Sequence, residues 1–383
     1  MSDNNQSALS DFIMTNEDRW CKIMGYFNPY LDPFTHHLQG DVPVYDSACY
    51  ERYPEHNYVY DKLWVAQSQE LAGGTVVELI DSGDRDGARY PLFVKPRWGH
   101  KTSGSKHCRK VSSPQDLPSR AQAVNQELIW SEYLPGREGM TDFVLVSGRV
   151  VYQMTHVYST EQKGFADVWK HTSPDHTPPG QVQRWVEENL SGFTGIANVQ
   201  YRDGVIIEVG LRPARTGAYF AATDNGPLLR SISRALSEGH WGFEDERLMR
   251  YTPFYSFKCH TQAPIVYTWP QHLLDLIMMG VTTRPFYEYY PEPTGREGMV
   301  FLQFMHDDLE EGKIACSYIE KLFTYTQWAI LGMWIVVAIM LVLNVPGKRY
   351  IVGLAIAIYA SQLLNPMSTH IRFHRARQAQ RST

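Results

Sequence analysis

The residues best suited to chemistry lie in two separate segments of this 383-residue chain. The first is Tyr90-Pro-Leu-Phe-Val-Lys95-Pro, which precedes a loop rich in Gly, Ser and Thr. The second is Asn198-Val-Gln200, followed after a short turn by Val205-Ile-Ile-Glu208-Val. A lysine beside a glycine-rich loop suits a polyphosphate, and carboxylate and amide oxygens together suit magnesium. The two segments together predict an ATP site.

The first segment offers positive charge and a flexible backbone to a phosphate group. An apolar run predicts a strand from Pro91 to Lys95, and the loop that follows contains Ser103, Gly104 and Ser105. Glycine lets the backbone approach a polyphosphate, while N–H groups and hydroxyls donate hydrogen bonds to its oxygens. The Gly-x-x-x-x-Gly-Lys-Ser/Thr pattern of a P-loop is absent. Taken alone, this segment also fits a basic surface hairpin.

The second segment places oxygen atoms on two neighbouring strands. Side chains alternate along a strand, so Asn198 and Gln200 share one face, and the turn at Asp203-Gly204 brings Glu208 alongside. A glutamate on a strand is usually a solvated residue. Glu208 instead interrupts an apolar pattern, where an unpaired charge is costly, and this favours a functional carboxylate.

A third segment, Trp130 to Glu138, lies between the other two and suits a nucleoside. Its apolar strand ends in Pro135-Gly136 and can offer backbone groups to the edge of an adenine. Glu138 can accept hydrogen bonds from ribose hydroxyls.

Composition describes a folded chain and argues against nucleic acid as a partner. Hydrophobic residues make up 43% of the sequence and charged residues 20%, which is ordinary for globular domains. The formal net charge of −5 gives no basic excess for a nucleic-acid backbone. The five cysteines are scattered without a Cys-x-x-Cys pair, which predicts reduced thiols. The polar N-terminus lacks the apolar run of a secretory signal.

Strand and helix signals are segregated along the chain. Apolar and β-branched runs predict strands at residues 91–95, 128–134, 140–146, 149–154, 197–201 and 205–209. Helices are predicted for 61–70 and 179–190, and residues 1–60 are predicted to be irregular. Turns at Ser147-Gly148 and at Asp203-Gly204 join strands into hairpins, so the predicted class is α+β.

The C-terminal part of the sequence predicts a transmembrane helical hairpin. The stretch from Trp328 to Val345 is nearly continuous apolar sequence and, at about 1.5 Å per residue, covers roughly 27 Å, close to the hydrocarbon thickness of a bilayer. A turn follows, and residues 350–364 are apolar again. A buried helical pair of a soluble core is the alternative. Four arginines in the tail, against Lys348 and Arg349 in the turn, predict that the tail and the large domain face the cytoplasm.

With these motifs in this order, the sequence resembles the ATP-grasp superfamily, the fold of D-alanine ligases, biotin carboxylases and carbamoyl-phosphate synthetases. The resemblance covers residues 60–220 and includes the strand Asn198-Val-Gln-Tyr with Glu208 on the next strand. It implies two α+β subdomains that grip ATP. The implied reaction is activation of a carboxylate to an acyl phosphate, followed by attack of an amine.

The resemblance also implies roles for individual residues. The implied ATP-binding residues are Lys62, Lys95, Ser103, Gly104, Ser105, Glu132, Tyr133, Leu134 and Glu138. The implied magnesium ligands are Gln200 and Glu208, with Asn198 as a further candidate. Lys95 and Arg212 are the implied catalytic cations, which would stabilise the acyl phosphate.

Two departures from the superfamily pattern leave alternatives open. The usual Glu-x-Asn metal motif appears as Glu208-Val-Gly210, so one amide ligand is missing, and the region before Lys62 is short. A membrane-anchored ATP-binding scaffold without turnover is one alternative. A small-molecule kinase on the same fold is another.

The sequence therefore predicts an integral membrane, ATP- and Mg²⁺-dependent ligase that joins a small-molecule carboxylate to an amine and has its catalytic domain in the cytoplasm. It gives no signal for an oligomeric state. The predicted parts are a reduced N-terminal region (1–60), an ATP-grasp domain (61–225), an accessory region without an assigned role (226–320), a transmembrane hairpin (321–366) and a basic tail (367–383).

Overall fold

The computed structural model describes residues 46–82, 88–101, 107–163, 166–242, 246–269, 271–284, 286–293, 298–343, 347 and 349–357. Contacts between residues divide the chain into two compact units. Unit 1 comprises Met1–Asp32, Glu161–Trp169 and Phe254–Thr383, and unit 2 comprises Pro33–Thr160 and Lys170–Pro253. Each unit combines helices with antiparallel sheet, which confirms the predicted α+β class.

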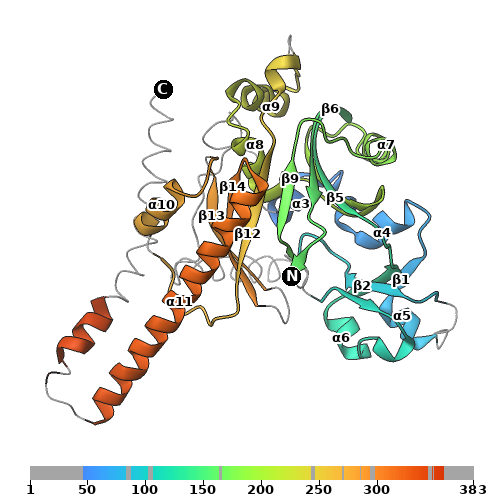
Figure 1. Ribbon diagram of the computed structural model, residues 1–383. Coiled ribbons are helices and arrows are strands. Elements are labelled where there is room, and N and C mark those ends of the chain that lie inside the picture. Colours follow the sequence, from blue (N-terminus) through green and yellow to red (C-terminus); the bar gives the residue numbers. More distant parts are fainter. Residues whose placement is uncertain are drawn as a thin grey trace, which may run out of the picture. The chain divides into compact units, whose positions relative to one another are not determined.

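Unit 2 contains a small sheet covered by two short helices (Figure 1). Its strands are β1 (Gly73–Thr75), β4 (Leu128–Glu132), β2 (Leu92–Pro96) and β3 (Arg109–Val111), in the spatial order β1-β4-β2-β3. The helices α5 (Val76–Asp81) and α6 (Arg120–Asn125) both begin with a capping box, formed by Thr75 with Glu78 and by Ser119 with Gln122. Apolar side chains from both helices and from β2, β3 and β4 form one core.

The larger sheet of unit 2 consists of hairpins. In spatial order its strands are β11 (Val205–Gly210), β10 (Gly195–Arg202), β5 (Glu138–Val146), β6 (Arg149–Tyr158) and β9 (Trp169–Thr172). The two predicted turns are confirmed, with positive φ at Ser147 and Gly148 and again at Asp203 and Gly204. Tight hairpin turns need this backbone conformation, which glycine adopts without steric cost.

Several of the remaining helices of unit 2 pack on the larger sheet. The remaining helices are α3 (Asp46–Arg52), η1 (Asn57–Tyr60), α4 (Lys62–Gln67), η2 (Pro114–Asp116), α7 (Gly180–Asn189), η3 (Ala214–Gly217), α8 (Ala218–Ala222), α9 (Gly226–Glu238) and η4 (Glu246–Met249). The predicted helices at 61–70 and 179–190 are confirmed by α4 and α7.

The prediction that residues 1–60 are irregular is wrong for α3 and η1, while residues 1–45 lie outside the described part. Both segments are too short for a clear helical pattern. Tertiary packing of Cys49, Val59 and Tyr60 into the core with Phe143 and Val209 stabilises them instead.

Unit 1 is built on strands that the sequence did not predict. β12 (Phe254–Thr261) and β13 (Tyr287–Pro293) both pair antiparallel with β14 (Met299–His306), and β7 (Gln162–Lys163) pairs with β8 (Ala166–Asp167). With α10 (Gln271–Met279) and α11 (Leu309–Val342), they enclose an aromatic core in which Phe301 stacks on Phe323 with ring centroids 3.9 Å apart.

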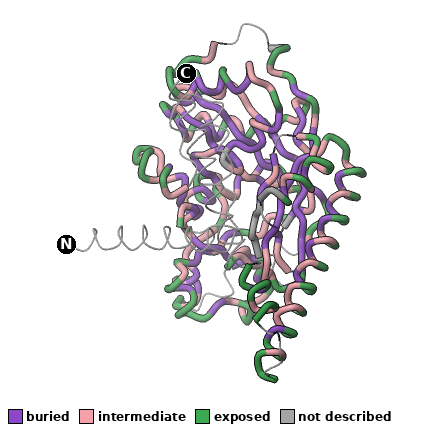
Figure 2. Tube along the Cα trace, turned by 90° about the vertical axis from the view of Figure 1, so that its left-hand side faces the viewer, coloured by how far each residue is buried: buried purple, intermediate pink, exposed green. Residues whose placement is uncertain are grey.

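Helix α11, the long orange-red helix of Figure 1, changes environment along its length. Cys316, Ile319, Phe323 and Gln327 are buried in unit 1. Beyond Gln327 the helix is largely exposed, from Trp328 at 53% to Val342 at 82%, as the green and pink tube of Figure 2 shows. Among the described residues, α11 alone is long and apolar enough to cross a membrane.

The structure begins this apolar helix at Leu309, well before the predicted hairpin at residues 321–366. Residues 349–357 are also helical, but the rest of the second predicted span and the tail at 367–383 lie outside the described residues.

Candidate functional site

A capped helix and a strand deliver two lysines to the same part of unit 2. The Asp61 carboxylate caps α4 by accepting hydrogen bonds from the N–H groups of Leu63 and Trp64, which places Lys62 at the first helical position. Arg97 fixes Asp61 from the other side, with Nη2 2.6 Å from Oδ2. Lys95 lies near the end of β2, as predicted, and pairs in register with Ile129 of β4.

Two buried lysines and one glutamate form the centre of the site. Lys62 Nζ lies 3.1 Å from Glu208 Oε1 on β11, and Lys95 Nζ donates a hydrogen bond of 2.8 Å to the carbonyl oxygen of Ile207. Lys62 and Lys95 are 5% and 7% exposed. The Glu208 side chain keeps 38% of its surface accessible, so this carboxylate is the member of the group that meets solvent.

The charges of this group do not balance locally. Burial lowers the pKa of Lys95, and repulsion from Lys62 lowers it further, to about 8. Burial also opposes charge on Lys62 and Glu208, but their mutual attraction prevails, raising the pKa of Lys62 and lowering that of Glu208. At neutral pH two ammonium groups therefore share one carboxylate, an arrangement that favours binding of an anion.

Strand β10 places the predicted amide oxygens beside Glu208. Gln200 faces Glu208 across the β10–β11 ladder, and Asn198 faces Gly210 in the same ladder, so all four positions share one face of the sheet. Asn198 is not open, because its Nδ2 donates a hydrogen bond of 2.8 Å to buried Asp142 Oδ1. Gln200 is thus the amide that faces Glu208 directly.

Asp142 on β5 holds the turn after β11 and was not predicted. Its two oxygens accept hydrogen bonds from the Ala214 N–H at 2.9 and 3.1 Å. On the other side, Asp142 Oδ2 lies 3.8 Å from His156 Nε2, and both side chains are fully buried. Burial lowers the pKa of His156. The Asp142 carboxylate therefore positions the segment that carries Arg212.

Arg212 is paired with an acidic residue that the sequence analysis did not single out. Its Nε and Nη2 lie 2.7 and 2.6 Å from Asp46 Oδ2 at the start of α3. Burial opposes the charge, but Asp46 outweighs it and raises the pKa of Arg212. Asp46 lies in the segment predicted to be irregular, where no periodic pattern pointed to it.

The residues predicted to bind the nucleoside lie on the small sheet and at the start of β5. Glu132 Oε1 accepts a hydrogen bond from the Ala72 N–H, and the Lys110 ammonium lies 4.2 Å from the centre of the Tyr133 ring. Leu134 and Glu138 both contact Arg202. Its Nη1 lies 3.4 Å from the Leu134 carbonyl oxygen, and its Nη2 lies 2.9 Å from Glu138 Oε2. The predicted loop residues Ser103, Gly104 and Ser105 lie outside the described residues.

The donor set fits a magnesium ion bound together with phosphates. Within the described residues, no group of three or more His, Cys, Asp or Glu side chains is arranged to hold a metal. A cation here would therefore combine Glu208 and the Gln200 amide with further oxygens. Asp46 Oδ1, a buried oxygen without a hydrogen-bond partner in the described part of the chain, is one such group.

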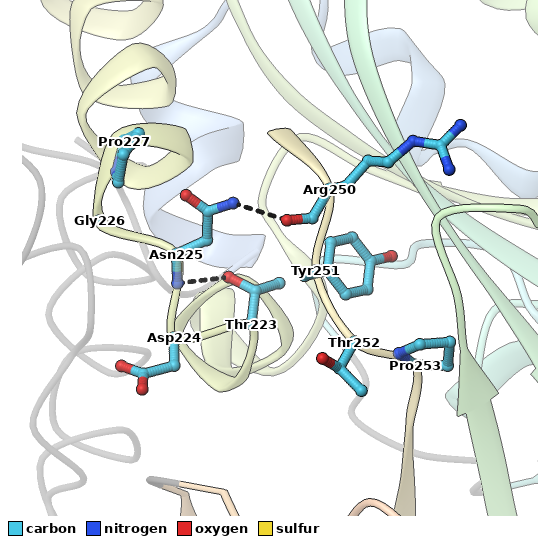
Figure 3. A pocket seen from close by; sticks show the side chains of 9 residues that line it. All are labelled: Thr223, Asp224, Asn225, Gly226, Pro227, Arg250, Tyr251, Thr252 and Pro253. Carbon is cyan, nitrogen blue, oxygen red and sulfur yellow. Dashed lines mark hydrogen bonds between the residues drawn. The ribbon is translucent and has the colours of Figure 1, made fainter. Parts of the chain in front are cut away.

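A surface depression of about 580 Å³ lies elsewhere in unit 2, between the start of α9 and residues 250–253 (Figure 3). Asn225 organises it: its Oδ1 caps α9 by accepting from the Leu228 N–H, and its Nδ2 donates to the carbonyl oxygens of Leu248 and Arg250. None of the predicted site residues lines this depression. These hydrogen bonds serve the loop and the helix cap, and we assign the depression no role.

Comparison with known proteins finds a distant sequence likeness to a ligase. No family model matches the chain. A D-alanine–D-alanine ligase of Parabacteroides distasonis is 23% identical over 216 residues, which are 52% of this chain and 64% of that protein. The chain thus covers less than two thirds of the length of this relative.

Solved structures give weak likenesses of the same kind. An L-amino acid ligase from Bacillus licheniformis has a TM-score of 0.47 and 17% identity, covering 68% of this chain and 70% of that one. A carboxyaminoimidazole ribonucleotide synthase from Aspergillus clavatus, complexed with ATP, has a TM-score of 0.46 and 12% identity, covering 73% and 79%. At these values the likeness carries no assignment of activity.

Proposed function

We propose that this protein is an ATP-dependent ligase of the ATP-grasp type that joins a carboxylate to an amine. One observation carries the proposal: Lys62, Lys95 and Glu208, predicted from three separate segments, lie together with more positive than negative charge. The sequence likeness to a D-alanine–D-alanine ligase supports it.

The proposed reaction has two steps. A carboxylate oxygen of the substrate attacks the γ-phosphorus of ATP, the bond from that phosphorus to the β,γ-bridging oxygen breaks, and ADP leaves. The amine nitrogen then attacks the acyl carbon of the acyl phosphate, loses a proton, and inorganic phosphate leaves. The products are an amide, ADP and phosphate. Both steps need positioning and charge stabilisation more than covalent catalysis by the protein.

The chain supplies positive charge to the phosphates of ATP, to the substrate carboxylate and to the acyl phosphate. Lys62 and Lys95 bind the phosphates, and buried ammonium groups act strongly because little water screens them. Arg212, held by Asp46, faces the substrate carboxylate and the acyl phosphate that forms from it. Glu208 and Gln200 hold magnesium, which neutralises phosphate oxygens when it is bound. Ser103, Gly104 and Ser105 cover the phosphates, and Glu138 accepts from the ribose.

We further propose that α11 anchors the ligase in a membrane, with the catalytic domain on the cytoplasmic side. The distal half of this helix exposes Ile335, Val336 and Ile339 at about half of their surface, and an apolar face of this size is unfavourable in water. Val336→Arg should release a large fraction of the protein from isolated membranes into a carbonate wash. The matched control Tyr318→Arg changes an exposed residue in the first half of α11 and should stay in the membrane fraction.

The test of the proposed activity is ADP release by the full chain in detergent with a panel of carboxylate and amine pairs. A ligase releases ADP over many turnovers only when both substrates are present, because the amine must consume the acyl phosphate formed in the first step, and mass spectrometry of the product shows an amide. A stable phosphorylated product instead of an amide would identify a kinase. ATP binding without ADP release for any pair would favour the scaffold alternative, to which Gly210 in place of the usual asparagine points.

A further inference from the structure

We propose that Asp46 is a ligand of the magnesium site and takes the place of the side chain that Gly210 lacks. This inference rests on the proposed function, because it concerns the cation that would accompany ATP. In this chain the strand carries Glu208-Val-Gly210, so it supplies one carboxylate but no second ligand for the magnesium ion. Asp46 would supply the missing ligand from α3.

The space beside Gly210 is filled by an Asp46 oxygen. A Cβ atom built on Gly210 would lie 2.8 Å from Asp46 Oδ1, while the next neighbours, Asp46 Cγ and Arg212 Cγ, are 3.8 and 3.9 Å away. A side chain at position 210 would therefore meet this oxygen first. The glycine and the aspartate are complementary: the absence of a side chain at one position admits the carboxylate from the other.

The two oxygens of Asp46 have different surroundings. Oδ2 is held by Arg212, which fixes the orientation of the carboxylate. Oδ1 is buried and has no hydrogen-bond partner in the part of the chain that the structure describes. A buried carboxylate oxygen left without a partner is costly, and a bound cation would remove this cost. A carboxylate that bridges a guanidinium and a metal through different oxygens satisfies both.

The sheet register directs this oxygen to the face that carries the other ligands. Gly210 follows Glu208 by two residues, so both positions face the same side of β11, and Gln200 faces Glu208 on β10. Asp46 Oδ1, next to position 210, joins the same face. One amide oxygen and two carboxylates then face a cation, and phosphate and water oxygens complete a magnesium shell.

Manganese tests this assignment because it binds at magnesium sites and is observed directly by electron paramagnetic resonance. The full chain in detergent is titrated with Mn²⁺, with and without a non-hydrolysable ATP analogue. Asp46→Ala and Asp46→Asn should each weaken Mn²⁺ binding about tenfold or more, as loss of metal-site groups commonly does. Gly210→Ala alone should also weaken it, because the added methyl group meets Asp46 Oδ1 without bringing an oxygen of its own.

The double variant Asp46→Ala with Gly210→Asn separates ligand loss from loss of the Arg212 ion pair. It restores an oxygen at position 210 but leaves Arg212 without Asp46, so recovery of Mn²⁺ affinity to within about threefold of wild type would support the ligand role. Circular dichroism establishes that each variant is folded. Loss of affinity in Asp46→Ala without recovery in the double variant would assign Asp46 to positioning of Arg212 and overturn the inference.

The proposed function and this inference fail in distinguishable ways. If wild type binds the ATP analogue and Mn²⁺, and both Asp46 variants bind Mn²⁺ equally well, the inference is overturned and the ATP site stands. If wild type binds Mn²⁺ in an Asp46-dependent way but binds no nucleotide, the inference stands and the ligase proposal falls.

Discussion

Both units of this protein bury lysines beside carboxylates, but they balance the charges differently. In unit 1, Lys258 Nζ lies 3.0 Å from Asp167 Oδ1, with both side chains more than nine-tenths buried, and the partly exposed Lys163 has its Nζ 2.8 Å from Glu320 Oε1. Each of these lysines has its own carboxylate. In unit 2, Lys62 and Lys95 share Glu208, and the hydrogen bond of Lys95 goes to a backbone carbonyl.

The number of carboxylates per lysine distinguishes an ion pair that stabilises the fold from a site that binds a ligand. A matched buried pair satisfies its own charges and adds nothing for a ligand to complete. A buried ammonium group without its own carboxylate destabilises the protein when no ligand is bound. Binding of an anion offsets this destabilisation. The depressed pKa of Lys95 is the sign of that cost. We expect the two lysine sites to differ in folding stability, nucleotide binding and pH dependence.

The largest expected effect is on folding, in unit 1. Lys258→Ala leaves Asp167 as a buried carboxylate without its ammonium partner and should lower the free energy of unfolding by about 3–5 kcal/mol. Lys95→Met removes a buried charge without a carboxylate of its own, and should leave stability unchanged or raise it. Urea unfolding in detergent, followed by tryptophan fluorescence, measures both. Equal losses in the two variants would remove the distinction between the sites.

The second expected effect is on nucleotide binding. Here the unit 2 variant should lose affinity and a unit 1 variant should not, the reverse of the effect on stability. Lys95→Met should weaken binding of a non-hydrolysable ATP analogue by about 10²-fold, or roughly 3 kcal/mol, because a buried charge facing the phosphates is lost. Isothermal titration calorimetry measures the affinity. The control Lys313→Met alters a lysine on the first turns of α11, paired with Glu310, and should bind as wild type does. Unchanged affinity in Lys95→Met would contradict the phosphate role.

The third expected effect is a pair of opposite pH trends from the same lysine. Between about 8 and the ordinary value of 10.5, Lys95 is neutral in the folded protein but protonated in the unfolded chain. Stability contributed by this group therefore rises with pH across that window. Affinity for the ATP analogue should fall over the same range, by up to about tenfold per pH unit, because the neutral amine no longer attracts phosphate.

Lys95→Met provides the matched control, since a methionine does not titrate. It should flatten both pH dependences while other titrating groups remain. A wild-type affinity that stays constant from pH 7.5 to about 9.5 would show that Lys95 is not the phosphate-binding charge.

The sequence predicted the residues of the site that lie on strands, because side chains alternate regularly along a strand. Period-two alternation gave the shared face of Asn198 and Gln200, and a Gly-containing turn placed Glu208 alongside on the neighbouring strand. The register pairs Glu208 with Gln200. The α+β class followed from the same hairpins. Lys62 came from family resemblance, and its contact with Glu208 is a fact of tertiary structure.

Other parts of the structure left no local signal. Asp46 reaches Arg212 across more than 160 positions of sequence, and no periodic pattern marks a contact of that kind. The strands of unit 1 carry Pro and aromatic residues at irregular intervals, so their pairing depends on the core around Phe301 and Phe323. Helix α11 extends back to Leu309 because its first half packs on β12 and β14, which the apolar run alone did not indicate.

The smallest expected effect tests Glu138, which is already paired in the structure and so resembles the matched sites of unit 1. Its pair with Arg202 is partly exposed, and Glu138→Gln should cost no more than about 1 kcal/mol in stability. If Glu138 also accepts from the ribose, the variant should bind ATP about fivefold more weakly and 2′-deoxy-ATP less affected, since one hydrogen bond is worth about 1 kcal/mol. Calorimetry with both nucleotides measures the difference. Equal losses for the two nucleotides would mean that Glu138 only orients Arg202, and Glu138 would then belong with Lys258 and Asp167 as a residue of the fold.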